Sequence, residues 1–171
     1  MPRIFLLLVL AALACAPAAA RQRSRKTPDI TTAQLDLKAV YQKWLDEDVV
    51  YIITPQERKA FSLLVSDTDR ERFIEEFWKR RNPDPAAKDN AYRAEHYRRI
   101  AYANQNFGGK APGWRTDRGR IYITLGAPDE IRQTPTGEVW FYKVLPSLGH
   151  NIEVEFVNDP DAGDLRLRQQ P

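Results

Sequence analysis

A short arginine-rich run, residues 113–120, holds the side chains best suited to chemistry. It contains one large aromatic residue and four charged ones: Trp114, Arg115, Asp117, Arg118 and Arg120. A guanidinium offers its N–H groups in a planar fork that matches a carboxylate or a phosphate. One hypothesis is a groove that binds an anionic ligand, such as a carboxylate-bearing glycan, with help from Arg80, Arg81, Arg98 and Arg99. In the alternative, Asp117 and nearby glutamates neutralise these arginines in structural ion pairs.

A second group of acids follows closely, in the segment from Gly126 to Glu130. Acid–base catalysis by a pair of carboxyl groups requires two groups in different environments. Pro128, Asp129 and Glu130 also suit the first turn of a helix, where acids complement the helix dipole. The surroundings of Asp117 and Asp129 would distinguish an enzyme from a binding module. If both are exposed and ion-paired, a binding module is favoured, and if one is buried within an open cleft beside an aromatic platform, an enzyme is favoured.

Other catalytic and metal-binding patterns are missing from the sequence. The two histidines, His96 and His150, are far apart, and the single cysteine is Cys15, so no metal-ligand cluster is predicted. No G-x-S-x-G motif for a nucleophile occurs. Gly108 and Gly109 follow a predicted helix, whereas a phosphate-binding loop joins a strand to a helix. We expect neither a metal nor another cofactor.

The net charge of +3 comes from the N-terminus. Five of the 26 basic residues precede Thr27, and no acid precedes Asp29, so the remainder has 21 basic against 23 acidic residues. A nucleic-acid-binding domain should itself carry a basic excess. We therefore expect no nucleic-acid partner.

Residues 1–20 have the layout of a secretory signal, because Arg3 precedes an apolar run that ends in small residues. Two cleavage sites compete: after Ala20, or before Cys15, which would then carry a lipid. Either way no second cysteine is left for a disulfide. The basic segment 21–30 is predicted to be a linker, either solvated or in contact with an anionic membrane surface.

Helical periodicity extends over residues 31–109. Predicted helix starts lie near Thr31, at Thr54 with its capping partner Glu57, at Thr68 with Glu71, and at Asp89 or Asn90, with a short extended segment at 49–53. Beyond a turn at 110–120, in which a glycine at each end would allow unusual backbone angles, alternation predicts strands over 121–168, beginning with Ile121, Ile123 and Leu125. Glu153 and Glu155 would face Arg166 and Arg168 across a strand pair.

These periods predict an α+β domain with about four N-terminal helices packed on a four-stranded antiparallel sheet formed by the C-terminal part. Three of the four tryptophans, Trp44, Trp78 and Trp140, fall on predicted apolar faces. Trp114 is either a core anchor that pins the turn or a platform for carbohydrate stacking.

The motif Gly113, Trp114, Thr116 and Asp117 resembles the signature of the GWxTD domain, a bacterial module of undefined function. Further points of likeness, spread over roughly residues 40–168, include Phe77 to Pro83, Gly126 with Pro128 and Asp129, and Trp140. The resemblance implies one GWxTD domain over residues 31–171, and it implies no activity.

Together these observations predict an exported protein of a bacterial cell envelope, either periplasmic or anchored at the outer membrane. It would be a non-catalytic binding or assembly module, and its partner would be an envelope protein or a cell-wall component. Membrane association would come from a lipidated Cys15 or from the basic linker. The rival hypothesis is an envelope hydrolase, or another enzyme acting on a cell-wall or glycan polymer, that uses Asp117 or Asp129.

Overall fold

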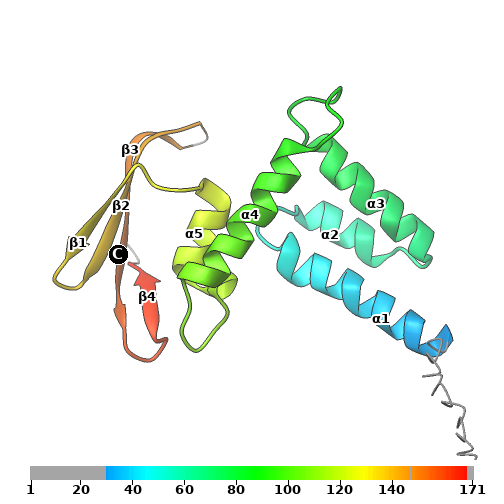
Figure 1. The fold of residues 1–171 in the computed structure, drawn as a ribbon, viewed down its shortest axis with the longest axis horizontal. Coiled ribbons are helices and arrows are strands. Elements are labelled where there is room, and N and C mark those ends of the chain that lie inside the picture. The colour runs from blue at the N-terminus through cyan, green and yellow to red at the C-terminus, as the bar shows by residue number, and fades with distance from the viewer. Residues whose placement is uncertain (1–29, 147, 169–171) are drawn as a thin grey trace, which may run out of the picture.

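The computed structural model describes residues 30–146 and 148–168, and it contains five α-helices followed by a four-stranded sheet (Figure 1). The predicted signal at 1–20, Cys15 and all of the linker except Ile30 lie outside the described residues. The α+β class is confirmed, with helices N-terminal to an antiparallel sheet. In chain order the elements are α1 (Ile30–Lys43), the π-helical turn η1 (Trp44–Asp48), α2 (Pro55–Ser62), α3 (Asp67–Arg80), α4 (Ala91–Asn106), the 3-10 turn η2 (Gly113–Arg115), α5 (Asp117–Leu125), β1 (Glu130–Thr134), β2 (Gly137–Leu145), β3 (Gly149–Asp159) and β4 (Asp164–Leu167).

The first three helices, together with part of α4, enclose a core of their own. Its buried residues are Tyr41, Trp44, Leu45, Val49, Phe61, Phe77 and Trp78. The capping box at Thr54 is confirmed, because its hydroxyl accepts from the Glu57 N–H and the Glu57 carboxylate accepts from the Thr54 N–H. The predicted start of the next helix at Thr68 is wrong, since Ser66 is the N-cap.

The predicted extended segment at 49–53 is also wrong. Here the chain leaves α1 through η1, and Val49 N–H donates to the Trp44 carbonyl at 3.0 Å. Val49 is fully buried, and the N–H groups of Ile52 and Ile53 both return to its carbonyl. A run of mostly β-branched residues thus forms a turn, because Val49, Ile52 and Ile53 fill the helical core and no strand of the described residues lies beside them.

The first predicted strand, at 121–125, is instead part of helix α5. Apolar residues at 121, 123 and 125 fit a short alternation, whereas those at 121, 122 and 125 fit a helix face, and the N-cap at Thr116 favours the helix. Ile121, Tyr122 and Leu125 pack against the sheet, while Ile123 packs toward α4. The sheet therefore begins at Glu130, and Pro128 with its two acids leads into β1 rather than opening a helix.

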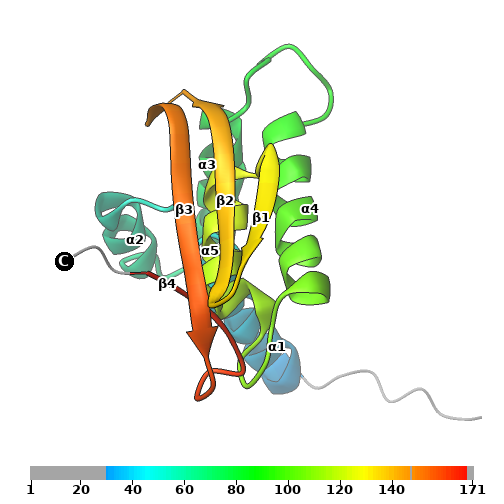
Figure 2. The ribbon, with the colours of Figure 1, turned by 90° about the vertical axis from the view of Figure 1, so that its left-hand side faces the viewer.

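The sheet is an antiparallel meander of order β1-β2-β3-β4, and the helices of the described residues cover one of its faces (Figure 2). Trp140 and Phe156, both fully buried, lie on the covered face beneath α5 and Phe107, the residue that ends α4. On the open face Arg168 pairs with Glu155 at 2.8 Å, as expected, but Arg166 pairs with Asp159. Glu153 has Arg132 at 3.9 Å instead.

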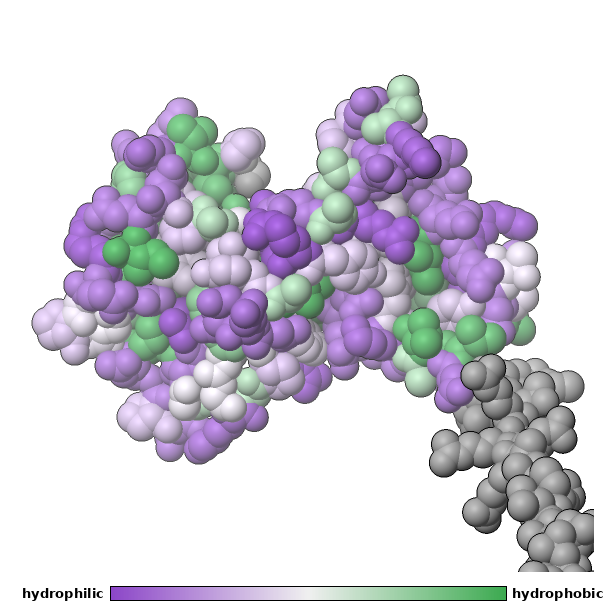
Figure 3. Space-filling model, viewed as in Figure 1, coloured by the Kyte–Doolittle hydropathy of each residue, from purple (hydrophilic) through white to green (hydrophobic). Residues whose placement is uncertain are grey.

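The helices do not all pack on the sheet, which corrects the predicted arrangement. Among the described residues, the core cluster of the sheet includes side chains of α5 and Phe107 but none of α1–α3. A third cluster, formed by Ala103, Trp114 and Ile123, joins the two halves. The surface is accordingly notched between a sheet half and a helical half, with polar and apolar residues interspersed on both (Figure 3).

Candidate functional site

The arginine-rich run and the β3–β4 loop enclose an open groove of about 330 Å³. Lys110, Arg115 and Asp117 line it on one side, and Asp159, Asp161 and Arg166 line it on the other. Five of these six residues are acids or arginines, and the sequence places the two walls far apart, since Asp159 lies 42 residues after Asp117. The groove is the place where the predicted motif reaches the surface.

Gly113 and Gly119 are required by close packing, which corrects the expectation of unusual backbone angles. Neither residue has a positive φ. A Cβ on Gly113 would lie 1.9 Å from the carbonyl oxygen of Ala103, and a Cβ on Gly119 would lie 1.9 Å from that of Gly113. The glycines therefore let α4, η2 and α5 come together backbone to backbone.

Trp114 is a core anchor rather than an exposed platform. It is 8 % exposed and packs with Ala103, Ile123 and Tyr51, whose ring centroid lies 6.3 Å away. Its backbone N–H donates to the Asn104 side chain at 2.9 Å, and its backbone carbonyl accepts from the Tyr51 hydroxyl at 3.0 Å. The residue thereby ties the turn to both the helical half and α4.

Thr116 and Asp117 organise the start of α5. The Thr116 hydroxyl accepts from Gly119 N–H at 3.0 Å and donates to the Gly113 carbonyl at 2.9 Å. Asp117 uses one oxygen to accept the Leu167 N–H of β4 at 2.9 Å and the other to pair with Arg120 at 3.1 Å. Each polar residue of the motif therefore makes a bond that positions backbone.

Arg115 differs from its neighbours. Its guanidinium lies over the Trp114 ring, 4.9 Å from the ring centroid, and the residue is exposed at the groove. No carboxylate pairs with Arg115 or Lys110 within the part of the chain that the structure describes. Arg120, in contrast, is held by Asp117.

Comparison with family models decides the identity. The model described as the GWxTD domain matches residues 33–164. The chain belongs to the GWxTD domain family. Neither the curated proteins nor the solved structures contain a match to this GWxTD chain.

Arg118 of the GWxTD run turns away from the groove into a buried ionic cluster that the sequence did not reveal. It pairs with Asp164, whose side chain is 3 % exposed, and lies 3.4 Å from Glu138. Glu138 also accepts the indole N–H of Trp140 at 2.8 Å, and the Arg118 guanidinium lies 4.9 Å from the Phe107 ring centroid. Among the described residues, Arg118 Nε and Asp164 Oδ2 are buried without a hydrogen-bond partner.

The other arginines of the anionic-groove hypothesis are not brought to the GWxTD groove. Arg80 and Arg81 both pair with Glu57 in the helical half, and Arg98 and Arg99 both pair with Glu95 on α4. These four therefore form structural ion pairs in two separate places.

The points of the GWxTD resemblance that lie after α5 begins have structural roles in the sheet half. Gly126 ends α5 with a φ of 91°, and its carbonyl accepts from the hydroxyl of Tyr142 at 3.1 Å. Asp129 is exposed and accepts the Lys143 N–H at 2.8 Å, while Pro128 precedes it and Trp140 is fully buried.

The pKa is lowered at one residue of the groove and at one residue of the interior, for different reasons. Hydrogen bonding from Ala162 N–H and from the Arg166 side chain lowers the pKa of Asp159 in the groove. Desolvation lowers the pKa of His96, which is 4 % exposed and lies 2.6 Å from the Asp48 carbonyl. His96 is thus a buried residue that ties α4 to η1.

Two general observations concern the described residues only. No helix among them is both long and apolar enough to cross a membrane. No group of three or more histidine, cysteine, aspartate or glutamate side chains among them forms a metal-binding arrangement.

Proposed function

We propose that this GWxTD protein is an exported, non-catalytic binding module of the cell envelope. Support comes from the bonding of the two acids that an enzyme would need. Both oxygens of Asp117 are engaged, by the Leu167 N–H and by Arg120, and Asp129 is exposed and holds the Lys143 N–H. Carboxylates used in this way position backbone and are poorly placed to exchange protons with a substrate.

The groove beside the GWxTD turn is the binding site in this proposal, and Arg115 is the observation that carries it. The other arginines of the motif are ion-paired, whereas the Arg115 guanidinium rests on Trp114 at the groove with its N–H groups directed to no carboxylate of the described chain. A planar cation held on an indole face is positioned to take a carboxylate. Lys110 adds a second positive charge.

The ligand class is a carboxylate-bearing glycan of the envelope, with a protein carboxylate as the alternative. The enzymatic alternative, a hydrolase that uses Asp117 or Asp129, requires one of these groups to be released from its backbone partner. Membrane association through Cys15 or the basic linker at 21–30 is a further part of the proposal that rests on the sequence alone.

Binding is tested with oligogalacturonate as the probe and its neutral methyl ester as the matched ligand. Isothermal titration should detect the acid and not the ester, and Arg115→Gln should remove binding. Arg132→Gln, a change at an exposed arginine on the open sheet face, is the control and should have no effect. Equal binding of acid and ester, or undiminished binding by Arg115→Gln, would overturn the groove assignment.

Export is tested separately, by mass spectrometry of membrane and soluble fractions of the native cell. The proposal predicts a chain that begins at Arg21 or at a lipidated Cys15. Full-length protein in the cytosol with Met1 intact would contradict it. Crosslinking in cells followed by purification would then identify the envelope partner.

A further inference from the structure

Strand β3 is much longer than the strand that covers its outer edge. β4 pairs only with Phe156–Asp159, and one more hydrogen bond joins Arg168 N–H to the Glu155 carbonyl at 2.8 Å. Alternate residues of an antiparallel strand direct their N–H and C=O groups to the same side. The Glu155 carbonyl faces the edge, since it accepts from Arg168 N–H. Glu153, two residues earlier, therefore also presents its N–H and C=O groups to the edge, where no strand of the described residues lies. Unpaired N–H and C=O groups at the edge of a sheet can pair with another chain.

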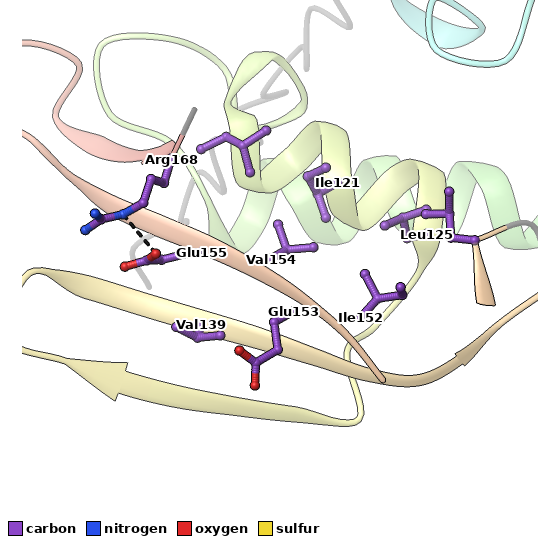
Figure 4. A pocket seen from close by; sticks show the side chains of 10 residues that line it. Ile121, Leu125, Val139, Ile152, Glu153, Val154, Glu155 and Arg168 are labelled. Atoms are coloured by element: carbon purple, nitrogen blue, oxygen red, sulfur yellow. Dashed lines mark ion pairs between the residues drawn. The ribbon is translucent and has the colours of Figure 1, made fainter. Parts of the chain in front are cut away.

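A pocket of about 430 Å³, lined by seven apolar residues and by Glu153, Glu155 and Arg168, lies directly beside this free edge. Figure 4 shows Ile121 and Leu125 of α5 on one side of it and Ile152 and Val154 of β3 on the other, directed toward one another. Glu153 points away from them, to the open face of the sheet. A strand laid along the edge would thus place alternate side chains in the pocket and the others beside Glu153.

The charge of the edge defines the second set of side chains. The Glu153 side chain is 56 % exposed, with only Arg132 near it at 3.9 Å. The chain's own β4 shows what this edge accepts, since Leu167 faces the covered side and the next residue, Arg168, pairs with Glu155 on the open side. An occupant that continues this pattern would alternate apolar and basic residues.

We propose that the free edge of β3 binds an extended segment of a partner protein, with alternating apolar and basic residues, as a fifth strand of the sheet. This site is separate from the GWxTD groove and does not rest on the proposed function. Pairing with the β3 edge of a second copy is disfavoured, because it would bring Glu153 and Glu155 of both copies onto one face of the joined sheet.

The probe is a labelled peptide of about eight residues, the length of an ordinary strand, that alternates leucine and arginine. Its control has the same composition with the leucines and arginines in separate blocks. Fluorescence anisotropy should show binding of the alternating peptide that is tighter by roughly tenfold or more, a difference large enough to reflect pairing rather than net charge. Hydrogen exchange should show protection of the Glu153 amide on binding.

Two substitutions separate backbone pairing from charge. Glu153→Pro removes the N–H directed to the edge, where a strand tolerates proline, and should abolish binding. Glu153→Ala keeps that N–H and should weaken binding only a few-fold. Glu153→Lys should shift the preference to a peptide that alternates leucine and glutamate, which keeps the proposal testable if the proline variant does not fold.

Equal binding of the two leucine–arginine peptides, or unchanged binding by Glu153→Pro, would overturn the proposal. So would protection of the Glu153 amide in the free protein. Protection that rises with protein concentration would assign the edge to a second copy. Protection that is independent of concentration and is lost on deletion of residues 169–171 would assign it to the chain itself.

Discussion

Each half of the molecule contains an arginine held over a phenylalanine ring by carboxylates, but the charges are balanced differently. In the helical half, Arg80 and Arg81 share the single carboxylate of Glu57, and Arg81 lies 3.6 Å from the Phe77 ring centroid. In the sheet half, Arg118 alone serves two carboxylates, those of Glu138 and Asp164. One cluster thus has an excess of cations and the other an excess of anions.

The two clusters also differ in how completely they are hydrogen-bonded. Arg81 donates to Glu57 and to the carbonyls of Phe77 and Ile52. Arg118 Nε and Asp164 Oδ2, in contrast, are buried without a partner among the described residues. Since buried charge is costly unless it is fully paired, the sheet half should be the more sensitive of the two to loss of its arginine.

Arg118→Met tests this difference and should have the largest effect. It leaves Glu138 and Asp164 buried without their cation, and breaking such a pair costs about 3–5 kcal/mol. Chemical unfolding followed by tryptophan fluorescence would measure the loss. Arg132→Met, at an exposed ion pair, is the control and should cost well under about 1 kcal/mol. Equal stability of the two variants would show that the cluster contributes nothing.

Glu57→Gln should have an intermediate effect. The side chain is 17 % exposed and accepts from two arginines and from Thr54 N–H, and hydrogen bonds to charged groups contribute about 1.5–3 kcal/mol. The free energy of unfolding should fall by about 2 kcal/mol, less than for Arg118→Met. A larger loss than that of Arg118→Met would reverse the ranking of the two halves.

Acid titration should expose the same interaction without mutation. Bonding to Arg81 lowers the pKa of Glu57 from 4.5 to about 2, so its contribution is complete above pH 4.5 and is lost as the pH falls toward 2. Wild-type stability should decline across this window more steeply than that of Glu57→Gln. Parallel pH profiles of the two proteins would contradict the assignment.

The smallest effects are expected at the helix caps, one in each half. Thr54→Ala and Thr116→Ala each remove a hydroxyl that accepts a backbone N–H, a loss of about 1 kcal/mol. The Thr116 hydroxyl also donates to the Gly113 carbonyl, so its removal should cost more than that of Thr54. Thermal unfolding of the two variants side by side would show whether the caps rank in this order.

The sequence predicts local features of this fold well and long-range ones poorly. The capping box at Thr54 was predictable because cap and partner lie within one turn, and the start of α4 was predicted at Asp89 or Asn90, of which Asn90 is the N-cap. Helix α5 was predicted as a strand because the four apolar residues between 121 and 125 fit both periods, and the cap at Thr116 together with packing between α4 and the sheet decides for the helix. The family was predictable from the ordered motif, since signature residues are local.

The candidate site was predictable only in part. Arg115 and Asp117 do line the groove, but the opposite wall comes from the loop at 159–164, which no local pattern connects to them. The pairing of Arg118 with Asp164 spans 46 residues. The need for Gly113 arises from a carbonyl of α4, so it follows from backbone proximity and not from turn type.

The bond from Leu167 N–H to Asp117 has a consequence for the order in which the molecule is completed. The aspartate of the signature lies at the start of α5, and one of its oxygens receives this bond from β4, fifty residues further along the chain. The motif is therefore fully bonded only when β4 has docked on the sheet.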